Sequence, residues 1–184
     1  MTGLPDADEL ISAAAIAAGF DHLAASVQPL IDESDCVLLG VLNGGMFPMV
    51  HLAERLNGDF LMDYCHATRY RGEQVGAVLE WREKPHFDFA GRTVVVVDDI
   101  FDEGTTLHAV AEYCRDAGAA QVVTAVMVIK ERSRDSALAL PDFDAGLTVP
   151  DVYVFGCGMD LNERWRHLPA IYGLRDALAE HGGA

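Results

Sequence analysis

Apolar residues along this chain follow two alternating patterns, short continuous runs and longer stretches with helical spacing. The continuous runs have the length of strands that are buried on both faces of a sheet. They lie at 36–42, 59–65, 93–97, 121–129 and 152–155. Apolar positions three or four residues apart predict helices at 46–56 and 105–117, and two more near the N-terminus at about 5–18 and 20–31. Because strands alternate with helices, the sequence predicts an α/β fold with a mainly parallel twisted sheet flanked by helices.

The run at 93–97 leads directly into the most informative segment of the chain, Asp98-Asp99-Ile100-Phe101-Asp102-Glu103-Gly104-Thr105-Thr106. Its acids would lie at the carboxyl end of a buried parallel strand, which is the edge where α/β sheets bind ligands. Gly104 permits a tight turn, and the helix that follows presents unpaired amides and two hydroxyls to an anion. The segment therefore fits a ligand with sugar hydroxyls and phosphate. Local chemistry leaves an alternative open, an ordinary helix capped by Asp102 with the other acids solvated.

This segment resembles the 5-phosphoribosyl 1-pyrophosphate (PRPP) signature of the type I phosphoribosyltransferases, in which two acids and then Asp-Thr-Gly follow an apolar run. The resemblance implies that Asp98 and Asp99 bind the ribose hydroxyls, directly or through a metal. It implies that Asp102 is a general base or proton partner near purine N7. It also implies a set of PRPP or nucleotide contacts at Glu103, Gly104, Thr105 and Thr106. Glu103 stands where the family usually has threonine, and we expect its amide to bind while its side chain turns outward.

Two adjacent glycines follow the run at 36–42, in the sequence Leu42-Asn43-Gly44-Gly45. Paired glycines can simply permit a turn, and the residues alone leave that explanation open. In the hypoxanthine-guanine branch of the family the matching loop contacts pyrophosphate, which implies this role for Leu42, Asn43 and Gly44. The Leu42–Asn43 peptide bond can be cis in that branch. Lysine is common there at the position of Asn43, so we expect one cationic contact to be missing.

Lys130 ends the apolar run at 121–129, although lysine is rare in this chain. A lysine at a strand end can extend to solvent, and that alternative is open. The resemblance implies instead that Lys130 donates a hydrogen bond to the exocyclic oxygen of a 6-oxopurine. An ammonium finds no acceptor on a 6-amino group, so such a contact would select hypoxanthine or guanine over adenine.

A second long match to the family lies at 152–169, near the C-terminus. The resemblance implies that Tyr153 stacks on the purine and that Val154 binds it through the backbone. It also implies that Asp160 helps to hold a magnesium ion and that Arg166 reaches pyrophosphate. From the residues alone, Tyr153 can equally belong to the core, and Asp160 and Arg166 can form a surface ion pair.

The span 69–89 mixes charged residues, glycine and proline without steady periodicity, and its length predicts a functional loop. Arg69 and Tyr70 lie where the family's flexible loop begins. The resemblance implies that this loop closes over the reaction centre.

Composition narrows the partners that the chain can take. A formal net charge of −16 argues against a nucleic-acid partner, which would need clustered Lys and Arg. A polyanionic substrate must then be met by local amides and a divalent cation. No apolar run approaches bilayer length, so we expect no membrane partner. Four widely spaced cysteines, mostly in apolar runs, are typical of reduced core thiols and predict a cytoplasmic protein.

The resemblance runs from about residue 36 to 174 and covers four motifs in the family's order. It implies the type I phosphoribosyltransferase fold as one domain, 1–184, with a small hood over the active site contributed by the terminal segments. It implies a Mg²⁺-dependent purine salvage enzyme that transfers 5-phosphoribosyl from PRPP to hypoxanthine and guanine, in a homodimer or homotetramer. Two alternatives stay open, a phosphoribosyltransferase for xanthine or another base, and a nucleotide-binding regulator of the same fold.

Overall fold

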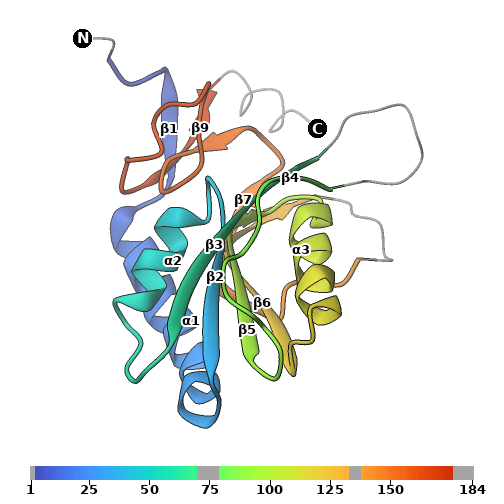
Figure 1. Ribbon diagram of the computed structural model, residues 1–184. Coiled ribbons are helices and arrows are strands. Elements are labelled where there is room, and N and C mark those ends of the chain that lie inside the picture. Colours follow the sequence, from blue (N-terminus) through green and yellow to red (C-terminus); the bar gives the residue numbers. More distant parts are fainter. Residues whose placement is uncertain (1–2, 70–78, 133–137, 176–184) are drawn as a thin grey trace.

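The computed structural model describes residues 3–69, 79–132 and 138–175. Its centre is a sheet with the strand order β4-β3-β2-β5-β6-β7 (Figure 1). These strands are β2 (Cys36–Val41), β3 (Leu61–Arg69), β4 (Leu79–Glu83), β5 (Thr93–Phe101), β6 (Gln121–Glu131) and β7 (Phe143–Pro150). Every neighbouring pair is parallel except β3 and β4. The predicted mainly parallel sheet is therefore confirmed.

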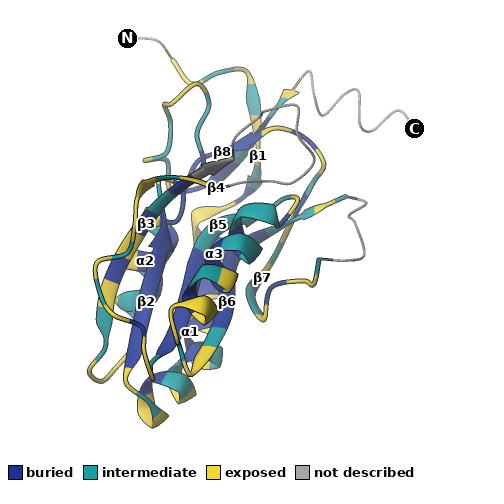
Figure 2. Ribbon diagram, turned by 45° about the vertical axis from the view of Figure 1, so that its right-hand side comes forward, coloured by how far each residue is buried: buried dark blue, intermediate teal, exposed yellow. Residues whose placement is uncertain are grey.

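Three helices cover this sheet, α1 (Ala13–Glu33), α2 (Met46–Ala53) and α3 (Thr105–Asp116). In the central strand β5, Val95 and Val97 pack in the apolar cluster of α1 and α2, whereas Val94 and Val96 pack in the cluster of α3. Successive side chains of a strand point to opposite faces, so a run of valines fills both layers at once. The buried strands between the helices are visible in Figure 2.

A second, three-stranded sheet joins the two ends of the chain beyond the carboxyl edge of the central sheet (Figure 1). It consists of β1 (Ala7–Ile11), β9 (Ile171–Leu174) and β8 (Val154–Phe155) in the order β1-β9-β8, and its paired strands are antiparallel. Arg175 links the same two ends through ion pairs with Asp6 and Asp8, at 2.5 and 2.6 Å.

The structure corrects the predicted N-terminal helices. Residues 7–11 form strand β1, and α1 continues without a break from Ala13 to Glu33. Ser12 begins the helix, because its hydroxyl accepts a hydrogen bond from the amide of Ala15 at 3.2 Å. Gly19 does not interrupt α1. A Cβ there would lie 2.9 Å from the carbonyl oxygen of Ala145, so the glycine allows close packing of the helix on β7.

Three further features of the strands differ from the prediction. The run at 152–155 contributes β8 to the small sheet and not a strand to the central one. The edge strand β7 was not predicted, because Gly146 and Pro150 weaken its pattern. In the predicted loop at 69–89, residues 79–83 form β4, and residues 70–78 lie outside the described part of the chain.

Asp63 fixes the return of the chain after β4. This side chain of β3 is buried, and its Oδ2 accepts hydrogen bonds from the amides of His86 and Phe87 at 2.7 and 2.9 Å. Its Oδ1 accepts a third from the amide of Tyr64 at 2.8 Å. A buried carboxylate with three amide donors is a stable anchor for an irregular segment.

The predicted core thiols are confirmed. All four cysteines are buried and form no disulfide: Cys36, Cys65, Cys114 and Cys157. Burial is the main cause that raises the pKa of each, to about 12 for Cys65 and Cys114 and to about 11 for Cys36 and Cys157. Thiols of this kind are protonated and unreactive. Among the described helices, none is both long and apolar enough to cross a bilayer.

Candidate active site

The segments with predicted chemistry meet at the carboxyl edge of the central sheet. Gly40 of β2 is paired with Val97 of β5, and Phe101 of β5 with Ile129 of β6. The parallel register therefore places the loop after β2, the acids at the end of β5 and the residues after 129 side by side. Strand register alone gathers three of the predicted segments.

The glycine loop after β2 packs tightly against the acids. The Leu42–Asn43 peptide bond is cis, as the resemblance allowed. The Asp99 carboxylate occupies the space that a side chain at Gly44 would need. From the other side, Gly158 comes close to the Gly44 carbonyl and leaves no room for a side chain of its own. The loop is thus held between β5 and the segment after β8.

A cavity of about 250 Å³ opens between this loop and the start of α3. Gly104 has φ of 79°, a left-handed conformation that favours glycine, and α3 begins directly after it. The amides of the first helical turn and the hydroxyl of Thr106 make this cavity a cradle for an anion. Predicted site residues that line it are Leu42, Gly44, Asp98, Asp99, Asp102, Glu103, Gly104 and Thr106. Thr105 and Asn43 are not among its lining residues.

Glu103 gives a carboxylate to the anion cradle. The residue is exposed, as expected for a side chain that turns outward, yet it also lines the cavity. The negative charge of Glu103 helps to raise the pKa of Arg132. The cradle is therefore less positive than one with a threonine at this position.

Asp98 and Asp99 form a strongly interacting acidic pair. Burial, followed by repulsion from the Asp99 carboxylate, raises the pKa of Asp98 well above its ordinary value. Burial also raises the pKa of Asp99, although a hydrogen bond from Asp98 and the positive charge of Arg166 oppose the rise. A bound cation or sugar hydroxyls would relieve this repulsion.

A second cavity, of about 220 Å³, lies beside the first and shares Asp99, Ile100 and Asp102 with it. Tyr153 is half exposed and lines this cavity, so it does not belong to the core. The other lining residues are Lys130, Val154, Met159 and Asp160. The structure thus brings every predicted purine contact into one cavity that adjoins the anion cradle.

Asp102 lies at the centre of a charged network on the wall between the two cavities. Its Oδ2 accepts a hydrogen bond from Lys130 at 3.2 Å, and its Oδ1 one from Arg132 at 2.5 Å. Asp151 lies within 4.0 Å of Lys130 and 3.7 Å of Arg132. Burial raises the pKa of Asp102, but the hydrogen bonds from the two cations outweigh it and hold the pKa below its ordinary value. Asp102 is therefore a carboxylate base at neutral pH, and Lys130 points into the network instead of out to solvent.

Sequence reasoning did not identify Arg132 or Asp151. A signal for Arg132 existed, because it follows Lys130 by two positions, and alternate residues of an extended chain share a side. Asp151 lies far along the chain, and no local pattern connects it with Asp102.

Arg166 is folded back on its own loop. It donates hydrogen bonds to the Gly158 carbonyl at 2.5 Å and to Asp160 Oδ1 at 2.6 Å. Asp160 also accepts one from the amide of Glu163 at 2.8 Å. The ion pair considered in the sequence is thus formed, and both partners adjoin the candidate site.

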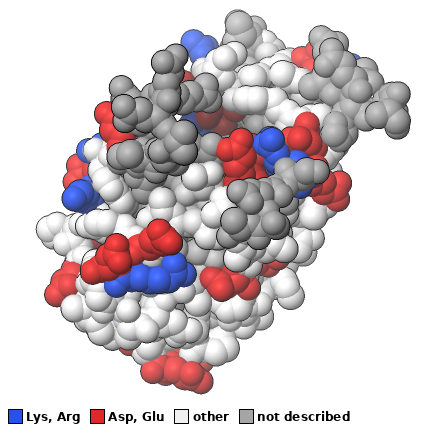
Figure 3. All heavy atoms as spheres, turned by 90° about the vertical axis from the view of Figure 1, so that its right-hand side faces the viewer, with Lys and Arg blue, Asp and Glu red and all other residues white. Residues whose placement is uncertain are grey.

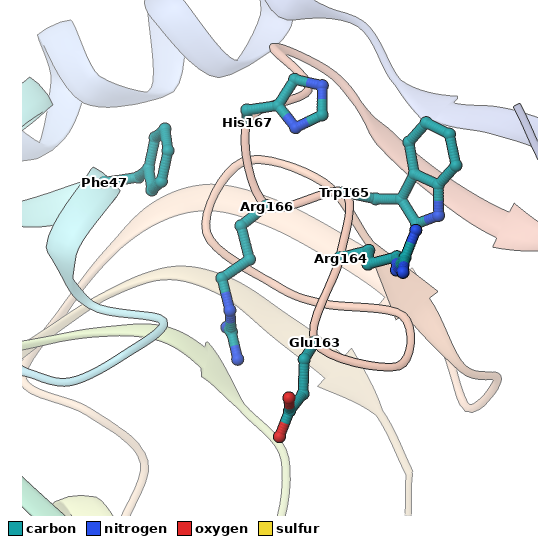
Figure 4. A pocket seen from close by; sticks show the side chains of 6 residues that line it. All are labelled: Phe47, Glu163, Arg164, Trp165, Arg166 and His167. Carbon is teal, nitrogen blue, oxygen red and sulfur yellow. The ribbon is translucent and has the colours of Figure 1, made fainter. Parts of the chain in front are cut away.

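A third cavity, of about 440 Å³, lies against this loop. Figure 4 shows its lining, with Phe47 of α2 facing the loop that carries Trp165 and Arg166. The acids at the end of β5 do not line it. This hollow is therefore separate from the anion cradle.

The predicted metal ligands have the right chemistry for Mg²⁺, which prefers carboxylate oxygens. Within the part of the chain that the structure describes, no three His, Cys, Asp or Glu residues lie close enough to form a metal centre by themselves. Mg²⁺ commonly takes only one or two protein carboxylates and completes its shell with water and substrate phosphate. The donors Asp98, Asp99 and Asp160 fit an ion held in that way.

Two residues of the predicted flexible loop cannot be placed in the site. The backbone of Arg69 ends strand β3, and its side chain is outside the described structure. Tyr70 lies wholly outside the described residues.

Figure 3 shows how basic and acidic side chains are distributed over one face of the molecule. On the face shown in Figure 3, Lys and Arg side chains lie in separate small groups, most of them beside Asp or Glu. Among the residues that the structure describes, this face therefore shows no continuous basic patch of the kind that binds nucleic acid.

Fold and site together define a class, an α/β protein with an anion cradle and acidic side chains at the carboxyl edge of a parallel sheet. Within that class, the chain belongs to the phosphoribosyl transferase domain family, whose family model matches residues 6–164. The predicted family and its type I fold are thereby confirmed.

Relatives within this family are similar over most of the chain. Hypoxanthine phosphoribosyltransferase of Escherichia coli is 30% identical over 139 residues, 75% of this chain and 77% of the relative. Hypoxanthine-guanine phosphoribosyltransferase of Bacillus subtilis is 28% identical over 172 residues, 93% and 94% of the two chains. A crystal structure of a hypoxanthine phosphoribosyltransferase from Staphylococcus aureus has the same fold, with a TM-score of 0.86, 22% identity and 94% coverage of both chains.

Proposed function

We propose that the protein is a purine salvage enzyme that transfers 5-phosphoribosyl from PRPP to hypoxanthine and guanine, with release of pyrophosphate. One observation carries the proposal: Asp102 lines both the anion cradle and the adjoining cavity that holds Lys130 and Tyr153. A base and an activated sugar bound in these cavities would meet at this carboxylate. The names of the relatives, a hypoxanthine phosphoribosyltransferase and a hypoxanthine-guanine phosphoribosyltransferase, support the same substrates.

In the proposed reaction, purine N9 forms a bond to the anomeric carbon of PRPP as the bond from that carbon to pyrophosphate breaks. Asp98 and Asp99 accept hydrogen bonds from the ribose hydroxyls and fix the ring, and their charge favours a cation-like sugar. The α3 amides and Thr106 hold the 5′-phosphate. The loop of Leu42, Asn43 and Gly44 contacts the departing pyrophosphate.

On the base side, Tyr153 stacks on the purine and the backbone of Val154 hydrogen-bonds to it. Lys130 donates to the 6-oxo group. Asp102 accepts the proton from N7 as the new bond forms, because its pKa lies below the ordinary value and it is ionised. Arg166 turns from Asp160 toward the pyrophosphate in this scheme.

Asp98, Asp99 and Asp160 would hold a Mg²⁺ ion, which would supply positive charge for the pyrophosphate oxygens. An average field from a net charge of −16 repels the substrate, and a local cation offsets that repulsion.

The proposal extends to the architecture around the site. We assign the chain a single domain, 1–184, in which the sheet β1-β9-β8 is the hood, because β8 follows Tyr153 directly. A homodimer or homotetramer is supported by exposed apolar side chains on neighbouring elements, Met46 and Val50 of α2 and Met62 and Tyr64 of β3. Unpaired buried thiols fit a cytoplasmic enzyme.

A pyrophosphate-release assay with PRPP, Mg²⁺ and each of hypoxanthine, guanine, xanthine and adenine tests the proposal. We expect turnover with hypoxanthine and guanine and little with adenine. A preference for xanthine would favour the first alternative, a phosphoribosyltransferase for another base. Nucleotide binding without release for any purine would refute the enzyme and favour the second, a nucleotide-binding regulator.

A further inference from the structure

Arg132 is the additional cation that the structure brings to the candidate active site. We propose that it is a positioning residue for phosphoribosyl transfer, which holds the Asp102 carboxylate at the wall between the two cavities and ties it to Asp151. This inference rests on the proposed function.

Two cations contact Asp102, and in the proposed reaction they have different roles. Arg132 binds Oδ1 at 2.5 Å and Lys130 binds Oδ2 at 3.2 Å, so each carboxylate oxygen has its own donor. In the proposed reaction Lys130 must turn to the purine oxygen. Of the cations that the described structure places on Asp102, Arg132 is then the one that remains. Arg132 therefore leaves Lys130 available to the substrate.

Arg132 also connects two segments that bind the base. Its Nε lies 3.7 Å from Asp151 Oδ2, and Asp151 comes two residues before Tyr153. A guanidinium presents donors in several fixed directions, so one arginine can hold two carboxylates at once. This link sets the position of Asp102 relative to the stacking residue.

The charges near Asp102 come from several segments. Lys130 and Arg132 at the end of β6 favour its ionised form. The acids that share its cavities or its cations place negative charge nearby: Glu103, Asp98 and Asp99 of β5, Asp151 after β7, and Asp160 after β8. If Arg132 is removed, repulsion from these acids weighs more heavily, and the pKa of Asp102 rises.

The test is the steady-state kinetics of the full-length Arg132→Gln protein with PRPP, Mg²⁺ and hypoxanthine. We expect kcat to fall about tenfold, as for a reacting group that is no longer held in place, while KM for PRPP changes little. The acid limb of the kcat/KM profile for hypoxanthine should move to higher pH by about half a unit to one unit.

Arg92→Gln is the matched control. Arg92 is 29% exposed, close to the 30% of Arg132, and it pairs with Asp35 at 2.8 Å. It precedes the first residue of β5, at the edge of the sheet opposite to the site. Kinetics of this variant should match those of the wild type.

A folded Arg132→Gln enzyme with the wild-type kcat and the wild-type acid limb would overturn the inference. If this variant does not fold, Arg132→Lys replaces it. The lysine ammonium would keep a positive charge near Asp102 but could not contact Asp102 and Asp151 at once. We therefore expect kcat to fall severalfold while the acid limb of the profile moves little. An unchanged kcat in the lysine variant would equally overturn the inference. Failure of the wild type to release pyrophosphate with any purine would instead refute the proposed function.

Discussion

The Asp99 carboxylate fills the space beside Gly44 that any other residue would need for its side chain. This contact joins the loop after β2 to the acids at the end of β5, so that the residues proposed to contact pyrophosphate and ribose line one cavity. It explains why the first of the paired glycines is required, beyond its use in a turn.

Gly44→Ala should therefore weaken PRPP binding. Forcing a methyl group into filled space costs about 1–3 kcal/mol, which corresponds to roughly a tenfold to hundredfold loss of affinity if the shifted groups are the binding groups. Isothermal titration calorimetry with PRPP and Mg²⁺ measures this loss. Gly3→Ala is the control, because a Cβ at Gly3 meets nothing within 4 Å. Equal affinity of the two variants would show that the contact has no part in binding.

Asp102→Asn should reduce turnover far more than binding. The amide keeps the shape of the side chain but cannot take the proton from purine N7, and loss of a general base costs about two to four orders of magnitude in rate. Single-turnover measurement of pyrophosphate release, together with equilibrium binding of the nucleotide product, separates the two effects. Wild-type turnover in this variant would remove the proposed role of Asp102.

Lys130→Ala should weaken discrimination between 6-oxo and 6-amino purines. The Lys130 side chain is only 12% exposed and lines the cavity that holds Tyr153. We expect KM for hypoxanthine to rise and the ratio of kcat/KM for hypoxanthine over adenine to fall. Lys84→Ala is the matched control, since the only other lysine lies over the ring of Tyr113. If the ratio survives in Lys130→Ala, selection of the base lies elsewhere.

Asp98→Asn should stabilise the free protein while it impairs binding. Burial and the neighbouring Asp99 raise the pKa of Asp98, so its ionised form is less favourable in the folded chain than in the unfolded one. As the pH rises, Asp98 therefore loses its proton at a lower pH in the unfolded chain than in the folded one. The free energy of unfolding is highest below the unfolded pKa and falls as the pH rises through the folded pKa. At pH 8 we expect Asp98→Asn to be more stable by about 1 kcal/mol or more.

Urea denaturation at several pH values checks this prediction. The difference in the free energy of unfolding should shrink as the pH is lowered and Asp98 becomes neutral. A wild type that is the more stable protein at pH 8 would contradict it.

Asp63→Ala should destabilise the whole domain. The substitution leaves three amides without their acceptor in a buried place, and hydrogen bonds to a charged group contribute about 1.5–3 kcal/mol each, without strict additivity. We expect a loss of roughly 3 kcal/mol in the free energy of unfolding. Asp88→Ala, which removes one exposed bond to the amide of Ala90, is the control and should cost much less. Similar losses in both would mean that Asp63 is no anchor.

Local sequence patterns were sufficient for the central layers. The valines at 94–97 predicted a doubly buried strand, and the acids and glycine that follow them lie at its carboxyl end, as expected, where they line a cavity. These features depend on residues that are adjacent in the sequence, where steric and burial requirements act directly.

Features that depend on distant pairing were missed. Residues 7–11 were predicted as helix but form strand β1. They are extended because they pair with β9, which lies far away in the sequence. The contact between Arg132 and Asp151 likewise forms only once β7 and the segment after it fold back beside β6. The resemblance supplied the roles proposed for Lys130 and Tyr153, but it did not predict the network around Asp102.

The central claim is that acids and backbone amides at the end of β5 bind an activated ribose phosphate. Calorimetric titration of the full-length protein with PRPP in the presence of Mg²⁺ tests it most directly. We predict saturable binding that is lost in Asp98→Asn and weakened in Gly44→Ala. An absence of binding by the folded wild-type protein would contradict the account.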